Sequence, residues 1–398
     1  MKFRVEREAL AEAVAWTARS LPPRPAVPVL GGVLLEVEET SLSVSGFDYE
    51  VSTQVDLLVH ASSPGRTLVS GRLLADITRA LPAQPVEVTV DGPRVTISCG
   101  SARFTLPTMP VEDYPTLPAM PSTVGTIPSD LFAAAVHQVA VAAGRDDTLP
   151  MLTGVRMEID GERLTLAATD RYRLAVRELT WKPEPVDLSQ AVLIPARTLA
   201  EAAKTLATDG PEITLALSDG GAGEGMIGFA GPGRRTTTRL LDAEFPRYQS
   251  LWPAEFSGAA DVPVAPLVDA VKRVALMAER GTPVRLAFEE SQVTLSAGGD
   301  DEGRAEERVE VSLSGDPIAV AFNPGYLLDG LSALSTDRAV LSFTTSIKPA
   351  VITGRNSADV PDTDTDTGTD GPADTGSGGT GSGSTEYRYL LMPVRLPG

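Results

Sequence analysis

Side chains that commonly carry out chemistry in proteins are scarce in this sequence. It has two histidines, His60 and His137, and one cysteine, Cys99, which lie far apart along the chain. Metal sites need several such ligands at close spacing, so the sequence predicts no metal centre. It also contains no G-x-x-x-x-G-K-[ST] phosphate loop and no G-x-S-x-G nucleophile motif. These absences argue against an enzyme and predict no cofactor.

One glycine pattern has two interpretations. Gly223-x-Gly225-x-x-Gly228 has the spacing of a dinucleotide-binding fingerprint. That fingerprint joins a strand to a helix, whereas residues 212–217 and 226–230 both alternate as strands. We therefore interpret the loop at 218–225 as a hairpin turn and keep an enzyme that binds a nucleotide there as the lesser alternative.

Polar and apolar side chains cluster in three other stretches, at residues 169–174 (TDRYRL), 244–248 (EFPRY) and 389–398 (YLLMPVRLPG). Leucine and methionine at the end of a strand indicate a surface that accepts several partners, if they are exposed. The alternative is a buried final strand. The sequence leaves both interpretations open.

The elements that must position these stretches repeat along the chain. A shift of 122 positions places residues 155–170 on residues 33–48 without a gap, and a shift of 129 places Val155 on Val284. A second register supports the first, because Leu74, Leu199 and Leu327 coincide within helix-like segments. The period is too long for a solenoid, so each of three units is predicted to be a domain with its own core.

Periodicity within each unit predicts an α+β fold of helices and antiparallel strands. Helices are predicted at residues 7–21, 71–81, 194–206 and 322–334, after a cap at Ser129 or Asp130, and around Leu267 to Val274. The final strand is predicted at residues 387–396.

Composition limits the class of protein. The 398 residues, 42% of them hydrophobic and 22% charged, fit two to four globular domains. A net charge of −19 argues against binding nucleic acid by bulk electrostatics. The single cysteine and the lack of a long apolar run predict a cytoplasmic location without membrane contact. Residues 356–385 contain six aspartates and no basic residue, which predicts a disordered acidic loop.

Four motifs carry a family resemblance: ATDRYRLAV at 168–176, FPRY at 245–248, FNPGYLLD at 322–329 and YLLMPVRL at 389–396. With the three units, they resemble the bacterial DNA polymerase III beta subunit family, the sliding clamps, in its actinobacterial form. The resemblance implies clamp domains at residues 1–121, 122–256 and 257–398, each with two helices backed by antiparallel sheets. It also implies a head-to-tail homodimeric ring around duplex DNA. A ring holds DNA topologically and without reading its sequence, so a net negative charge is acceptable.

The resemblance also assigns three groups of residues. Basic residues on helices and flanking loops would face the DNA: Arg19, Arg24, Arg72, Arg79, Arg145, Arg197, Lys204, Lys272 and Arg273. The dimer contact would join Ile77, Leu81, Phe104 and Leu106 to Leu276. The family's peptide pocket falls on Leu152, Thr169, Arg171, Tyr172, Arg173, Leu174, Pro246, Leu251, Asn323, Tyr326, Ile347, Pro349, Leu391, Met392, Pro393, Val394 and Arg395.

Such a pocket would dock linear peptide motifs of the replicative polymerase, the clamp loader and repair proteins. Two alternatives stand beside this replicative role. One is a second-copy clamp that confers self-resistance to a clamp-binding antibiotic. The other is a peptide-binding scaffold that does not bind DNA.

Overall fold

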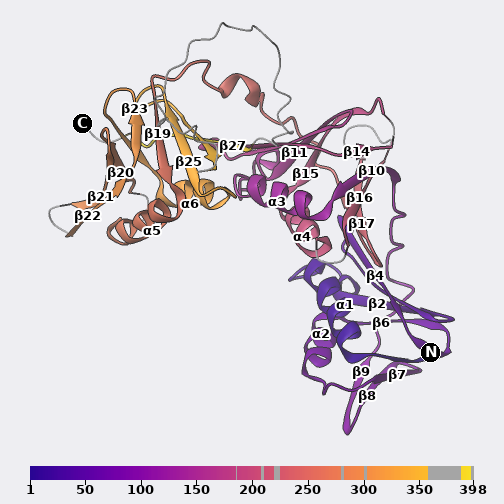
Figure 1. Cartoon of the computed structure of the whole chain (residues 1–398). Coiled ribbons are helices and arrows are strands. Elements are labelled where there is room, and N and C mark those ends of the chain that lie inside the picture. Colours follow the sequence, from indigo (N-terminus) through magenta and orange to yellow (C-terminus); the bar gives the residue numbers. More distant parts are fainter. Residues whose placement is uncertain are drawn as a thin grey trace, which may run out of the picture. The chain divides into compact units, whose positions relative to one another are not determined.

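The computed structural model describes residues 1–184, 186–207, 210–218, 225–278, 282–299, 303–356 and 387–395 (Figure 1). The chain forms two compact units. The first comprises Met1–Ala133, Trp181–Leu188 and Arg197–Asp242, and the second comprises Ala134–Thr180, Ser189–Ala196 and Ala243–Gly398.

The first unit contains two antiparallel sheets. The smaller has the strand order β5 (His60–Ser63), β1 (Lys2–Val5), β7 (Val86–Asp91), β8 (Arg94–Cys99) and β9 (Ala102–Pro107). The larger has the order β14 (Lys182–Pro183), β10 (Ser122–Pro128), β16 (Glu212–Leu217), β17 (Met226–Gly231), β18 (Arg234–Arg239), β4 (Val51–Leu58), β3 (Ser41–Phe47), β2 (Gly32–Glu38) and β6 (Gly65–Ser70). Two segments far apart in sequence join where β4 pairs with β18, with Thr53 opposite Thr236.

Helices α1 (Arg7–Ser20) and α2 (Gly71–Ala80) pack side by side in this unit (Figure 1). Leu10 and Val14 of α1 and Leu74 of α2 are buried in one core with the strands. Prolines follow α1 and end it, since proline has no N–H and fixes its own φ; the chain continues through η1 (Pro28–Gly31). Helix α4 (Ala196–Leu206) buries Leu199.

The second unit has the same kind of construction. Its larger sheet has the order β15 (Ser189–Pro195), β11 (Gly154–Asp160), β12 (Arg163–Thr169), β13 (Arg173–Thr180), β27 (Tyr387–Leu391), β26 (Ala350–Arg355), β25 (Arg338–Phe343), β19 (Gly258–Pro263) and β23 (Ser312–Ser314). Its smaller sheet has the order β22 (Gly303–Glu310), β21 (Gln292–Gly299), β20 (Val284–Phe288) and β24 (Ile318–Phe322).

Helices α5 (Val264–Val274) and α6 (Pro324–Ser332) lie next to each other in the second unit (Figure 1). Helix α3 (Ser129–Ala140) begins in the first unit and ends in the second. Three short 3₁₀ helices complete the described elements: η2 (Pro150–Leu152), η3 (Tyr248–Leu251) and η4 (Ala275–Met277).

The predicted repeat is confirmed strand by strand. Strands β2, β3 and β4, shifted by 122 positions, coincide residue for residue with β11, β12 and β13. Helices α2, α4 and α6 begin at Gly71, Ala196 and Pro324, which are the registers that the leucines predicted. The two large sheets also have corresponding strand orders, with β4 next to β18 in one and β13 next to β27 in the other. The predicted α+β fold of tandem repeated units is therefore confirmed.

Several predicted boundaries were wrong. The final strand ends at Leu391 and not at 396, and residues 396–398 lie outside the described part of the chain. Helix α6 begins two residues later than predicted, because the Asn323 side chain accepts a hydrogen bond from Tyr326 N (3.2 Å) and caps it. The Ser129 hydroxyl has no hydrogen-bond partner in the structure, so it does not cap α3. The predicted acidic loop lies outside the described residues, apart from Asn356.

Candidate functional site

A tight turn between β12 and β13 begins the site. Oδ1 of Asp170 accepts hydrogen bonds from the backbone N–H groups of Tyr172 (3.0 Å) and Arg173 (3.1 Å). Thr169 donates its hydroxyl to the carbonyl of Arg173 (2.7 Å) and is buried, so it supports the turn from within. Arg171 has a φ of 79°, a left-handed conformation that costs free energy in an L residue. The turn leaves Tyr172 56% exposed and directs Arg173 inward.

The Arg173 guanidinium is buried, with 6% exposure, and paired on two sides. Its Nε donates to Asp170 (2.9 Å) and its Nη1 donates to Asp329 on α6 (2.5 Å). Its central carbon lies 4.3 Å from the ring centroid of Tyr326. Burial alone would lower the pKa of Arg173, but the interactions with Tyr389, Asp329 and Asp170 outweigh burial and raise it. A permanently charged side chain therefore fastens the turn to α6.

Tyr389 of β27 completes this network. Its hydroxyl donates to the carbonyl of Tyr326 at 2.8 Å. Its ring covers Gly330 so closely that a Cβ at that position would lie 2.5 Å from a ring carbon. Burial raises the pKa of the Tyr389 hydroxyl and exceeds the opposing effect of Arg173, so the hydroxyl remains a donor at neutral pH. Glycine is thus required at 330 for α6 to pack on β27.

A depression of about 390 Å³ lies against the network. Six of the predicted pocket residues line it: Leu152, Arg171, Tyr172, Arg173, Asn323 and Tyr326. Arg145, predicted for the DNA-facing surface, also lines it, so the structure places Arg145 with the pocket residues. Asp146 lies beside it, and hydrogen bonds from the Thr148 hydroxyl and backbone lower the pKa of its carboxyl group.

The residues after β27 form a short tail that is partly exposed. Met392 N donates to the carbonyl of Tyr172 (2.8 Å), and Val394 N donates to the carbonyl of Ala321 (2.8 Å). Met392 keeps 38% of its surface exposed. Pro393 between them has no N–H to donate, which ends the strand pairing; Arg395 is exposed.

Two predicted pocket residues in these strands were wrongly expected to be accessible. Leu174 on β13 and Leu391 on β27 are both buried in the core of the second unit. The final strand is thus core as far as Leu391, and its apolar surface begins at Met392. Both interpretations of the last residues were therefore right for different parts of the segment.

The FPRY segment is held on the same unit by aromatic side chains. The Tyr248 hydroxyl donates to Glu158 at 3.1 Å, and the guanidinium of Arg388, on β27, lies 4.8 Å from the ring centroid of Trp252. These contacts leave Pro246 and Leu251 exposed.

The segment before β26 contributes the remaining predicted residues. Ile347 is exposed and Pro349 is half-buried. Ala350 pairs with Leu391, so the register places Pro349 beside Met392.

The other eight predicted DNA-facing residues are exposed on helices or the loops beside them: Arg19, Arg24, Arg72, Arg79, Arg197, Lys204, Lys272 and Arg273. Two of these charges are neutralised, since Arg79 pairs with Asp76 (3.3 Å) and Arg273 forms two bonds to Glu307 (2.6 and 2.9 Å). The bond to Arg273 lowers the pKa of Glu307.

The residues predicted for a dimer contact differ in exposure. Ile77, Leu81 and Leu106 belong to the core of the first unit, so they are not open apolar surface, contrary to the prediction. Phe104 is partly exposed on β9, an edge strand, and Leu276 is 82% exposed after α5.

The described residues contain no group of three or more side chains that could hold a metal ion. No helix among them is long and apolar enough to cross a membrane. The loop with the glycine pattern joins two antiparallel strands, with Leu217 opposite Ile227, which confirms the hairpin; Gly223 lies outside the described residues. A Cβ at Gly228 would meet the Met120 sulfur at 2.5 Å, so packing accounts for this glycine.

Repeated α+β domains whose sheets join across the repeats, with a depression beside the exposed Tyr172, are the features by which the chain can be compared with known proteins. Family models described as the N-terminal, central and C-terminal domains of the DNA polymerase III beta subunit match residues 1–118, 126–247 and 249–366. The chain belongs to this family.

Known proteins are similar to this chain along its whole length. The beta sliding clamp of Streptomyces coelicolor is 57% identical over 398 residues, which is 100% of both chains. The "Beta sliding clamp homolog GriR" of Streptomyces muensis is 46% identical over 395 residues, which is 99% of both. The Bacillus subtilis DNA polymerase sliding clamp superposes with a TM-score of 0.85 at 25% identity, and the Pseudomonas aeruginosa clamp bound to griselimycin with 0.84 at 26%; both cover 100% of each chain. The protein is thus a DNA polymerase processivity factor and a non-catalytic subunit.

Proposed function

We propose that two copies of this chain close head to tail into a ring around duplex DNA and dock partner peptides on the second unit. The observation that carries the docking site is the buried Arg173 network, which holds the exposed Tyr172 beside Met392. A rigid support of this kind reduces the entropy lost when a peptide binds. The partners are linear motifs of the polymerase, the clamp loader and repair proteins, and the expected location is the cytoplasm.

Edge strands support the ring. β9 and β22 each end a sheet in the single chain, and unpaired edges are normally covered. Phe104 on β9 and Leu276 offer the exposed apolar surface for such a contact. The domain boundaries at 121 and 256 belong to the same proposal. Because the ring holds DNA topologically, binding needs few ion pairs with phosphates.

The test combines retention on DNA with peptide binding. Loaded protein should stay on closed circular DNA at moderate salt and leave linear DNA by sliding off its ends. Tyr172→Ala combined with Met392→Ala should weaken binding of a polymerase-derived peptide about tenfold to a hundredfold, because two apolar anchors are lost. Leu58→Ala, which removes a still more exposed apolar side chain from the first unit, should leave peptide binding unchanged. Retention that does not depend on DNA topology would contradict the ring.

Similarity favours the replicative role over a second-copy resistance clamp. The chain is 57% identical to the Streptomyces coelicolor clamp and 46% identical to the GriR homolog. A replicative clamp should support growth as the only clamp gene of its cell. Failure to do so, with normal peptide binding, would favour the resistance role.

A further inference from the structure

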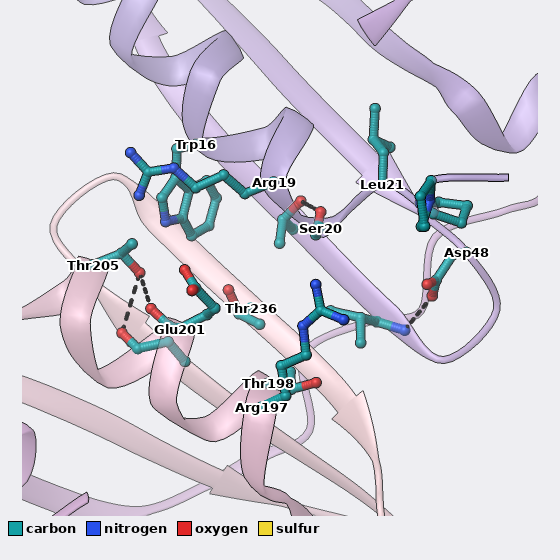
Figure 2. A pocket seen from close by; sticks show the side chains of 15 residues that line it. Trp16, Arg19, Ser20, Leu21, Asp48, Arg197, Thr198, Glu201, Thr205 and Thr236 are labelled. Carbon is teal, nitrogen blue, oxygen red and sulfur yellow. Dashed lines mark hydrogen bonds between the residues drawn. The ribbon is translucent and has the colours of Figure 1, made fainter. Parts of the chain in front are cut away.

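The first unit contains a cavity of about 280 Å³ that corresponds by repeat to the depression described above (Figure 2). It lies at the turn that a shift of 122 positions relates to residues 170–173. Oδ1 of Asp48 accepts from the N–H groups of Glu50 (3.0 Å) and Val51 (2.7 Å), and Tyr49 has a φ of 76°. The backbone of this turn therefore matches that of the Asp170 turn.

Side chains at corresponding positions explain why this cavity is open. Tyr389, opposite Ala175 in one sheet, is replaced by Thr236, opposite Thr53 in the other. The repeat also replaces Arg173 by Val51 and Tyr326 by Thr198. Three large side chains that fill the second unit are thus small in the first, and all three of the small residues line the cavity.

The cavity wall combines apolar surface, hydroxyl groups and charge. Trp16, Leu21 and the two prolines at 22 and 23 form its apolar side. Figure 2 shows the side chains of Arg197 and Glu201 pointing from α4 toward α1, where Arg19 lies beside Trp16.

The two arginines of the wall are available for a ligand. Arg19 and Arg197 are exposed, and in the described part of the chain neither has a hydrogen bond or ion pair. Arg72 donates to the carbonyl of Pro22 in the wall (3.5 Å) and adds a third positive charge at the rim. The lining also holds two carboxylates, Asp48 and Glu201, of which Asp48 accepts two backbone N–H groups. With Arg72 included, three positive charges face two negative ones, which favours an anionic ligand.

We propose that this cavity receives one unpaired nucleotide of a DNA strand. The base would lie against the apolar side, and its phosphate would bind Arg19 or Arg197. Glu201, whose carboxylate faces the cavity, would accept an N–H of the Watson–Crick edge of the base. That edge is free only in unpaired DNA, which gives a preference for single strands. The cavity volume of about 280 Å³ lies just below the ~300–1,000 Å³ typical of small-molecule sites.

The proposal rests on the proposed function only because single-stranded DNA next to the encircled duplex would supply the strand. Binding of the strand itself needs no ring. The probes are a short fluorescent oligodeoxythymidylate, the same backbone with abasic sites, and free thymidine monophosphate. The full-length protein should bind the thymidine strand about fivefold to a hundredfold more tightly than the abasic strand, the range expected from stacking of one base. Free monophosphate that competes only weakly would identify the strand, and not a free nucleotide, as the ligand.

Three variants locate the binding. Thr198→Tyr introduces the side chain found at the repeat position Tyr326, fills the cavity and should abolish the preference for bases. Arg197→Ala should weaken binding of the thymidine strand at least about fivefold. Arg94→Ala removes the same charge from β8 of the first unit, outside the cavity, and should weaken binding of the thymidine strand less than about twofold. Melting temperatures of all three confirm that they fold.

The outcomes separate the alternatives. Equal binding of thymidine and abasic strands, or equal losses in the Arg197 and Arg94 variants, would mean surface electrostatics only and would overturn the proposal. Loss of partner-peptide binding in Thr198→Tyr, with the oligonucleotide unaffected, would show that the cavity takes a peptide and would overturn it as well. Retention on circular DNA, measured on the same variants, should persist in all three. If the unmodified protein were not retained on circular DNA, the ring would be rejected, and the oligonucleotide measurements would still test the cavity separately.

Discussion

The sheet that joins β4 to β18 and the sheet that joins β13 to β27 have the same backbone plan and different interiors. Each has an aspartate-capped turn with a left-handed residue, at Asp48 in one and Asp170 in the other. Next to this turn the second sheet has Arg173, held between two carboxylates, where the first has Val51. The comparison shows that the repeat preserves hydrogen bonds of the backbone, whereas side chains decide what each site can bind.

The difference has a direct physical consequence. In the second unit Arg173 and Tyr389 fill the space beside the turn and hold Tyr172 at the surface, so recognition occurs on an outer face. In the first unit Val51 and Thr236 leave that space empty, so recognition can occur inside a cavity. One fold thus offers a supported surface in one place and an open pocket in the other.

The largest expected effect comes from removing the arginine. Arg173→Leu leaves Asp170, which is nearly buried, and Asp329, which is 45% exposed at its side chain, without a partner. Breaking a buried pair costs ~3–5 kcal/mol, and the exposure of Asp329 reduces the expected loss to about 2–4 kcal/mol. Calorimetry should show a clearly lower melting temperature. Arg163→Leu, which breaks an exposed pair with Asp160, should lower the melting temperature far less, because an ion pair in water contributes little to stability. Equal losses in both variants would mean that the network is not a structural support.

The next effect tests the close contact of α6 with β27. Gly330→Ala places a Cβ 2.5 Å from the Tyr389 ring, and overpacking of this kind costs ~1–3 kcal/mol. The repeat position on α4 already holds an alanine, Ala202, because Thr236 leaves room for it. Ala202→Gly should therefore cost only ~1 kcal/mol, the loss of helix propensity. Thermal unfolding of both variants checks the order, and a smaller loss for Gly330→Ala would contradict the packing difference.

Much of the fold follows from the sequence, because periodicity and repetition are local or self-consistent signals. The repeat registers and the helix faces, such as Leu267 and Val271 on α5, were predicted correctly. The burial of Leu174 and Leu391 was not, since it depends on strand pairing between segments more than 200 residues apart. Membership of a motif indicates that a residue is near a site and does not indicate which way its side chain points.

The ion-pair network was also missed, although a signal existed. Glu201 and Asp329 coincide under the second register, and the aspartates at 48 and 170 coincide under the first. The shift of 122 also places Arg173 on Val51, but the sequence alone does not show that Arg173 lies between the two aspartates of the second unit. Both the Arg173 network and the cavity of the first unit lie where the repeats differ in side chains, and not where they agree.

The smallest expected effect compares the two left-handed residues. An L residue in this conformation costs ~1–2 kcal/mol, which glycine avoids, but glycine loses more chain entropy on folding, by roughly 0.5–1 kcal/mol. Arg171→Gly should therefore raise stability by up to ~1 kcal/mol, since the exposed Arg171 side chain contributes little packing. Tyr49→Gly should change stability little, because it also removes the contact between the Tyr49 and Phe47 rings. The centroids of these rings are 5.7 Å apart, and such a contact contributes ~0.5–1.5 kcal/mol.

Gly92→Ala is the reverse control, since Gly92 has a φ of 55° with open space around it. This variant should lose ~1 kcal/mol of stability from the strained backbone alone. Differential scanning calorimetry of the three variants gives the comparison. Stabilisation by Tyr49→Gly equal to that by Arg171→Gly would show that the ring contact contributes nothing. Destabilisation by Arg171→Gly would show that the Arg171 side chain supports the Asp170 turn, and the two turns would then differ in side-chain support as well as in their surroundings.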